Sequence, residues 1–165
     1  MCWIARYGTV IYENTNGNQV RCQSADKSKF SQYWRIINEN GKYYIQNVLS
    51  ERYIKKQNGA FSQIYSTSAT KSASANGFTL SKTDNDTEHT YAIVDQNPAG
   101  LHCDASSNVV GWYYTDNNNS IWGFQPVEVT EEEIAEARKS YVEFETLSKN
   151  LSAYNTHMKA LFSDL

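Results

Sequence analysis

The sequence predicts an all-β fold made of three copies of one unit, followed by a helix. Before residue 128, apolar residues occur in short alternating runs that Asn, Gly, Ser and Asp interrupt, a pattern typical of many short strands. Three bulky rings, Trp34, Phe78 and Trp122, are separated by 44 residues each, and each is followed two positions later by another apolar residue. After residue 128 the apolar residues recur every three or four positions, which predicts a helix.

Further apolar positions support an internal repeat of about 44 residues. Two strand positions recur at the same step between the first and second repeats: Val10 with Ile54, and Val20 with Ile64. In the third repeat we expect their counterparts at Leu101 and at Val109 or Val110, with an insertion near residues 96–100.

A repeat of this length restricts the architecture. Helical repeats need stretches of 3.6-residue periodicity, and none precedes Thr130, while three propeller blades are too few to close a ring. Three four-stranded repeats can instead close one barrel with a triangular cap, which is the β-trefoil. We predict this fold for residues 1–127, with the three rings in the barrel core.

Residues 128–165 are predicted to form an amphipathic helix. Thr130 followed by three glutamates is a capping-box start, with acidic side chains at the positive end of the helix dipole. The apolar positions that would share one face are Ile134, Ala137, Tyr141, Phe144, Leu147, Leu151, Tyr154, Met158 and Leu161. We expect the start of a following helical domain, which either folds back on the trefoil or self-associates through this face.

Composition excludes several classes of function. Residues 1–127 hold 11 Lys/Arg and 10 Asp/Glu without a basic stripe, so we expect no nucleic-acid binding. No apolar run approaches the roughly 18–20 residues of a membrane span. Cys2, Cys22 and Cys103 form no CxxC pair, which argues against a zinc site, and we expect no cofactor. Free thiols and one disulfide with an unpaired third cysteine both fit this spacing.

The ends of the repeats carry short sequence motifs. The first repeat has Gly17-Asn18 before its predicted third strand and Gln32-Tyr33-Trp34 before its fourth. At the latter place the second repeat has Asn76-Gly77-Phe78 and the third has Ser120-Ile121-Trp122. This pattern resembles the ricin-type lectin repeat, which places Gly-Asn before its third strand and Gln-x-Trp before its fourth, and one copy of three keeps the glutamine. The third repeat also resembles divergent trefoil modules attached to secreted bacterial glycosidases.

This resemblance implies a sugar site in the third repeat. In the family, a site uses the residue beside the second-strand core position, an aromatic residue at the end of the third strand, and an Asn or Gln near Gln-x-Trp. On this chain these are His102, Trp112 and Asn119, with Asp104 and Asp116 as neighbours. An aromatic face would pack on the apolar side of a pyranose while polar groups bind its hydroxyls.

Two alternatives remain open at these positions. Trp112 either contacts a ligand or packs, as Tyr113 could, under the loop 115–119. The second repeat offers Lys55 and Tyr65 at similar places, but it has lysine where the family has a carboxylate. Lys55 therefore belongs either to a site for an acidic sugar or to the solvated surface.

The sequence thus predicts a non-catalytic carbohydrate-binding module of a larger secreted bacterial protein, such as a glycoside hydrolase. His102 and Cys103 are adjacent on a predicted strand and so point to opposite faces, which disfavours a catalytic dyad. The alternative function is a structural or protein-interaction trefoil that binds no glycan. The expected partners are a glycan or oligosaccharide and the neighbouring domains. The expected location is secreted or at the cell surface, with the export signal removed.

Overall fold

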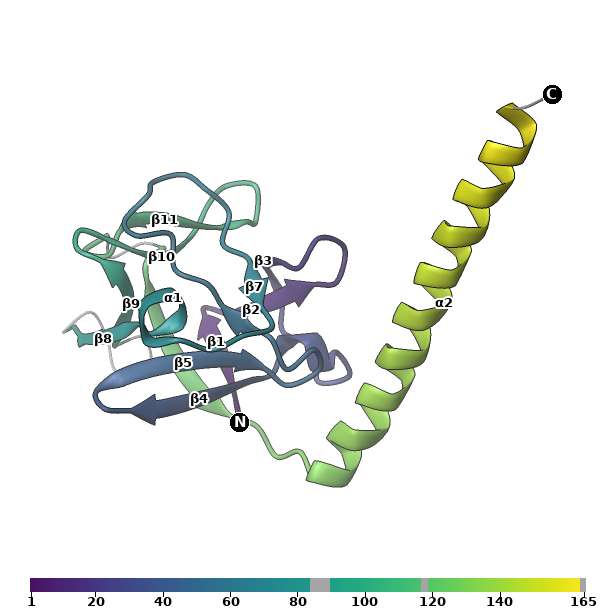
Figure 1. The fold of residues 1–165 in the computed structure, drawn as a ribbon. Helices are drawn as coiled ribbons and strands as arrows, with labels where there is room; N and C mark the ends of the chain where they lie inside the picture. Colours follow the sequence, from purple (N-terminus) through teal and green to yellow (C-terminus); the bar gives the residue numbers. More distant parts are fainter. Residues whose placement is uncertain (84–89, 117–118, 164–165) are drawn as a thin grey trace. The chain divides into compact units, whose positions relative to one another are not determined.

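The structure is a computed structural model that describes residues 1–83, 90–116 and 119–163. Its chain divides into two compact parts, Met1–Val129 and Thr130–Leu165, two residues after the boundary that we draw from the sequence. The first part is built of short antiparallel strands and the second of one helix (Figure 1).

The strands of the first part form three successive groups of four. The first repeat contains β1 (Cys2–Arg6), β2 (Thr9–Asn14), β3 (Gln19–Ser24) and β4 (Trp34–Glu39), with a 3-10 turn, η1 (Phe30–Gln32), before β4. The second contains β5 (Lys42–Asn47), β6 (Tyr53–Ile54), β7 (Thr67–Ser68) and β8 (Thr79–Lys82), with the single-turn helix α1 (Ala73–Asn76) before β8. The third contains β9 (Tyr91–Gln96), β10 (Ala99–Cys103), β11 (Val109–Tyr113) and β12 (Ile121–Pro126).

The first and fourth strands of the three repeats close a six-stranded barrel. Strand β1 pairs with β4 and β12, β4 pairs with β5, and β9 pairs with β8 and β12, all antiparallel. The ring closes between β5 and β8, where Tyr43 and Phe78 exchange two backbone hydrogen bonds of 2.9 Å. A closed ring leaves no unpaired edge between these strands.

The second and third strands of each repeat form hairpins that meet in a triangular cap. Val20 N donates to Tyr65 O at 2.8 Å, and Tyr65 N donates to Val109 O at 2.8 Å. The third side is held by Cys22 N, which donates to Ser107 O at 2.9 Å. Barrel and cap together make the predicted β-trefoil.

Two of the equivalences predicted from the fixed 44-residue step are wrong by one position. Tyr65, not Ile64, contacts the axis of the cap, and Ile11, not Val10, joins Ile54 in the core cluster. The turns inside the cap hairpins differ in length between repeats. In a strand, a shift of one residue exchanges the inward and outward faces, so a fixed step then selects the wrong side chain.

The three repeated rings meet in one core, as predicted. Trp34, Phe78 and Trp122 are each 0% exposed and belong to the same buried cluster. Burial of each ring contributes roughly 2–3 kcal/mol. The indole Nε1 of Trp34 donates to Ile11 O, and that of Trp122 donates to Leu101 O, both at 2.9 Å.

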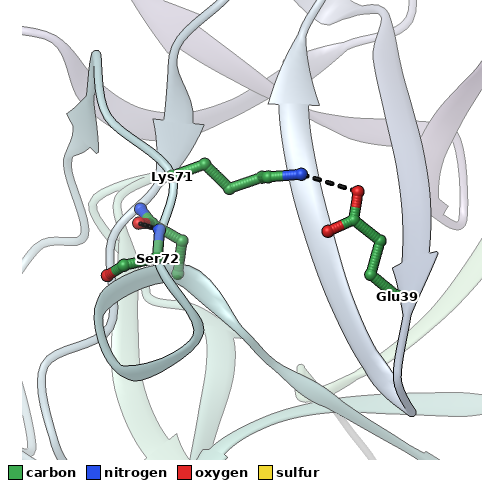
Figure 2. Close-up of polar contacts among 4 residues, drawn as sticks. Glu39, Lys71 and Ser72 are labelled. Carbon is green, nitrogen blue, oxygen red and sulfur yellow. Dashed lines mark hydrogen bonds and ion pairs between the residues drawn. The ribbon is translucent and has the colours of Figure 1, made fainter.

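The second repeat makes the equivalent hydrogen bond with a different residue. Phe78 has no N–H, and the neighbouring Asn76 donates from Nδ2 to Ile54 O at 3.2 Å. Asn76 is the last residue of α1, and its side chain is fixed because its Oδ1 accepts a hydrogen bond from Ser72 N, just before the helix, at 3.0 Å. Next to Ser72, Lys71 forms an ion pair with Glu39 on β4 at 2.7 Å (Figure 2). The amide of Asn76 thus supplies the hydrogen bond that Phe78 lacks.

The second part of the chain is the helix α2 (Glu131–Ser163), which confirms the predicted helical segment. Its capping box forms as expected, with Glu133 N donating to Thr130 Oγ1 at 3.1 Å. Ile134 is its one buried residue among those described. Within the described residues, no helix combines the length and the apolar character that crossing a membrane requires.

Candidate functional site

A pocket of about 230 Å³ opens on the hairpin β10–β11 of the third repeat. Its wall also includes a residue from the segment that joins β6 to β7 in the second repeat. The lining residues are Ser62, His102, Asp104, Ala105, Val110 and Trp112. Three of the residues that the resemblance implies therefore lie around one hollow.

The aromatic wall of this pocket is Trp112, a half-buried residue on β11. Its ring lies 5.4 Å from that of Phe61, 5.5 Å from that of Tyr113 and 6.0 Å from that of His102, measured between centroids. Phe61 and Tyr113 also contact each other edge-on at 4.7 Å. Trp112 therefore both packs and lines the pocket, and these neighbouring rings fix its orientation.

His102 is positioned by a chain of two hydrogen bonds. Its Nδ1 lies 2.8 Å from Ser120 Oγ, which donates to Tyr113 O at 2.8 Å. Because the hydroxyl hydrogen of Ser120 is used by that carbonyl, His102 Nδ1 must be the donor and Nε2 the acceptor. Burial lowers the pKa of His102 and outweighs the opposing effect of Asp116, so the neutral ring is favoured.

Asp104 lies at the turn between β10 and β11. Its Oδ1 accepts hydrogen bonds from Ser106 N and Asn108 N, both at 2.9 Å, and its own N donates to Asn108 O at 2.9 Å. One carboxylate oxygen therefore shapes the turn, a common role for aspartate. The side chain also lines the pocket.

The other two third-repeat residues lie in the connection between β11 and β12 and do not line this pocket. Asn119 Oδ1 accepts a hydrogen bond from the guanidinium of Arg6 on β1, and Asn119 O accepts from Cys103 N at 3.0 Å. Asp116 O accepts from Ser120 N at 3.2 Å. The structure brings His102, Asp104 and Trp112 together and places Asn119 and Asp116 beside them.

The second-repeat prediction is wrong for Tyr65, whose side chain is 0% exposed in the core. Its hydroxyl donates to Asp95 Oδ2 at 2.9 Å, and burial together with this carboxylate raises the pKa of Tyr65. A ring enclosed in this way has no face for a ligand. Lys55 is exposed, and its backbone N donates to Ser66 O at 2.9 Å. Tyr65 therefore cannot be the aromatic wall of a site at Lys55.

The three cysteines are free thiols in this structure. The thiol of Cys22 on β3 is hydrogen-bonded to that of Cys103 on β10. This contact lowers the pKa of Cys103, because it stabilises the thiolate, and raises that of Cys22. Cys2 is buried, and burial raises its pKa to about 11. Among the described residues, no group of three or more His, Cys, Asp or Glu could hold a metal ion.

Comparison with solved structures gives the same architecture. A lectin from Polyporus squamosus, solved with the epitope Neu5Aca2-6Galb1-4GlcNAc, aligns over 74% of this chain at 17% identity with a TM-score of 0.62. The Macrolepiota procera ricin B-like lectin, solved with lactose, aligns over 76% at 12% identity with a TM-score of 0.64. The chain adopts the β-trefoil fold of the ricin B-like lectins.

The same trefoil also occurs within larger proteins. A GlcNAcα1-4Gal-releasing endo-β-galactosidase from Clostridium perfringens aligns over 76% of this chain at 15% identity with a TM-score of 0.61. The present chain spans 47% of the Polyporus lectin and 32% of the endo-β-galactosidase, but 94% of the Macrolepiota lectin. No family model and no curated protein matches the sequence.

One part of the trefoil site was missed by sequence reasoning: the segment 55–66 between β6 and β7. It brings Phe61 against Trp112 and Ser62 into the pocket wall. Ser62 N donates to Gly111 O at 2.8 Å, and a Cβ on Gly111 would lie 2.0 Å from Ala60 O. The signal that could have found it is Phe61, a large ring within the otherwise polar run 55–63.

The pair Ser120–His102 has the residue types of a nucleophile and a base, but not their geometry. Ser120 is 0% exposed, and its hydroxyl donates to a backbone carbonyl. A substrate cannot reach a hydroxyl enclosed in this way. The pair therefore serves to orient His102 at the pocket of the trefoil.

Proposed function

We propose that this chain is a non-catalytic carbohydrate-binding module whose site is the pocket of the third repeat. The observation that carries the proposal is the position of Trp112, which is half-buried, braced by Phe61 and part of the pocket wall. An aromatic face in a hollow suits the apolar C–H side of a pyranose ring.

The polar groups of the pocket suit sugar hydroxyls. His102 Nε2 would accept a hydrogen bond from one hydroxyl, because Nδ1 holds the proton. The carboxylate of Asp104 keeps Oδ2 for a second hydroxyl, since Oδ1 is used in the turn. With about 230 Å³ the pocket is smaller than typical sites of about 300–1,000 Å³ for drug-sized ligands, so it suits one sugar residue of a longer glycan.

We further propose that the module belongs to a larger secreted or surface-displayed bacterial protein, and that this parent is a glycoside hydrolase. The similarity to a trefoil portion of the Clostridium perfringens enzyme supports this proposal. A tethered module would hold its parent near a glycan, because linkage supplies effective concentration. Neighbouring domains are then its other partners.

A glycan array tests the central proposal with three proteins. The wild-type chain should bind one group of glycans, and Trp112→Ala should lose this signal at least ~10-fold, since the sugar then loses its stacking surface. Tyr12→Ala is the matched control, because Tyr12 is a half-buried aromatic residue on the hairpin β2–β3 of the first repeat. Circular dichroism should show all three proteins folded.

Two array results would contradict the proposal. A wild-type chain that binds no glycan removes the carbohydrate-binding function. Equal binding by wild type and Trp112→Ala removes the third-repeat pocket as its site.

The alternative is a structural trefoil that contacts neighbouring domains. The observation in its favour is that two repeats have replaced the glutamine of Gln-x-Trp, by Asn76 and Ser120. Tyr113, 47% exposed, would then be part of a protein contact. This alternative predicts that a longer protein containing the adjacent domains protects Tyr113 from solvent, as hydroxyl-radical footprinting would measure.

A further inference from the structure

The helix α2 carries an apolar stripe that the described structure leaves exposed. Six of its members, from Phe144 onward, are 51–68% exposed: Phe144, Leu147, Leu151, Tyr154, Leu161 and Phe162. At 3.6 residues per turn these side chains lie within an arc of about 100° of the helix surface. An ordered band of this kind on a solvent-exposed helix indicates a contact surface.

The charges of α2 are divided between its two ends. Residues 131–147 contain six glutamates and two basic residues, Arg138 and Lys139, a balance of −4. Residues 148–163 contain Lys149 and Lys159 and no acidic residue, a balance of +2. When two stripes face each other in antiparallel orientation, residue 144 lies opposite residue 162, so Lys159 of each copy lies along the helix beside Glu143 and Glu145 of the other.

A parallel in-register pair would instead place segments of like net charge beside each other, and would align the two helix dipoles unfavourably. In antiparallel pairing both the side-chain charges and the helix dipoles attract each other. The surface is thus complementary to itself, and only in one orientation.

We propose that α2 is a self-association surface that pairs two copies of this chain through antiparallel α2 helices. The stripe from Phe144 to Phe162 extends over about five turns, or ~28 Å at 1.5 Å per residue. Its apolar positions recur on average slightly less than 3.6 residues apart, the period that favours left-handed supercoiling of paired helices. This proposal does not depend on glycan binding by the trefoil.

Analytical ultracentrifugation of the whole 165-residue chain tests the surface. The wild type should show a concentration-dependent monomer–dimer equilibrium. Leu147→Gln with Leu151→Gln should raise the dimer dissociation constant ~100-fold or more, because each dimer loses four buried leucines. The matched control is Ser152→Gln with Thr156→Gln, two exposed positions on the opposite side of α2, which should dimerise as the wild type does.

The orientation is tested by Lys159→Glu. In the antiparallel pair this change replaces attraction between Lys159 and the facing Glu143 and Glu145 by repulsion, so it should weaken the dimer several-fold at low salt, and the difference should fade as salt screens the charges. In a parallel in-register pair position 159 faces position 159 of the other copy, so the change replaces one like-charged pair by another and should leave the dissociation constant nearly unchanged. Circular dichroism verifies that the helix is retained in each variant.

Several results would overturn the proposal. They are a monomeric wild type at all concentrations, a trimer or larger assembly, a dimer that survives the double leucine change, and a dimer that Lys159→Glu does not weaken. A monomer whose stripe is protected from solvent would mean that α2 packs within its own chain.

Discussion

The second and third repeats of the trefoil have the same strand order, but their hairpins differ in length and contribute differently to the pocket. In the third, β10 and β11 pair over five residue positions and present His102 and Trp112 at the pocket. In the second, β6 and β7 pair over only two positions, and the segment between them lies against β11. The comparison shows that the site belongs to neither repeat alone, because the third supplies the wall and the second supplies the segment that braces it.

The two repeats also build their cores differently. Trp122 fills the core and donates a hydrogen bond to Leu101 O with one side chain. In the second repeat Phe78 fills the core while Asn76 makes the corresponding bond to Ile54 O. The same structural need is met by one residue in one repeat and by two in the other.

The largest expected effect is on the free energy of unfolding. Trp122→Ala should lower it by about 3–5 kcal/mol, through the cavity and the lost transfer free energy of the ring. Asn76→Ala should lower it by about 1–3 kcal/mol, because Ile54 O is left buried without its partner. Urea titrations followed by tryptophan fluorescence report on the trefoil, since all four tryptophans precede residue 128. An Asn76→Ala protein as stable as the wild type would show that Asn76 does not replace the missing indole N–H.

The next effect concerns how the second repeat braces the third. Gly111→Ala places a Cβ 2.0 Å from Ala60 O, so the segment carrying Phe61 must move. We expect glycan affinity to fall ~10-fold, since the orientation of Trp112 depends on that segment. Gly41→Ala is the control, because it introduces a residue at φ +79° but has open space around its Cβ. If Gly111→Ala and Gly41→Ala bind glycan equally well, the bracing has no role in the site.

The sequence predicts the barrel core of this arrangement well, because packing restricts the core rings to equivalent positions, and it predicts the cap less well, because the hairpins there vary in length. Rings at a fixed step, as at 34, 78 and 122, mark the barrel core because packing at the axis tolerates few alternatives. The cap hairpins vary in length, so the same step misplaced Tyr65, which the structure has in the core. Phe61 was missed because its contact with Trp112 joins two repeats and has no periodicity within either.

A smaller effect should appear with pH. His102 has a pKa below its ordinary value of 6.5, chiefly because burial disfavours the charged ring. A depressed pKa means that the unfolded chain binds the proton first, so this contribution to stability is complete above pH 6.5 and is lost as pH falls through the folded pKa. Glycan affinity should also fall as pH falls through the folded pKa of His102, because the protonated ring has no acceptor at Nε2.

His102→Gln should remove this pH dependence while keeping a polar side chain in the pocket. Fluorescence titrations with an array-selected glycan between pH 4 and 8 would measure both proteins. An identical pH profile in the two proteins would exclude His102 as the titrating group.

The most direct test of the central claim follows the indole N–H resonances of the four tryptophans by nuclear magnetic resonance. During titration with a glycan selected on the array, the Trp112 signal should shift progressively with occupancy. The signals of Trp34 and Trp122, which are fully buried in the core, should stay in place. A glycan that binds the chain while the Trp112 resonance stays unchanged would contradict a sugar site in the third-repeat pocket.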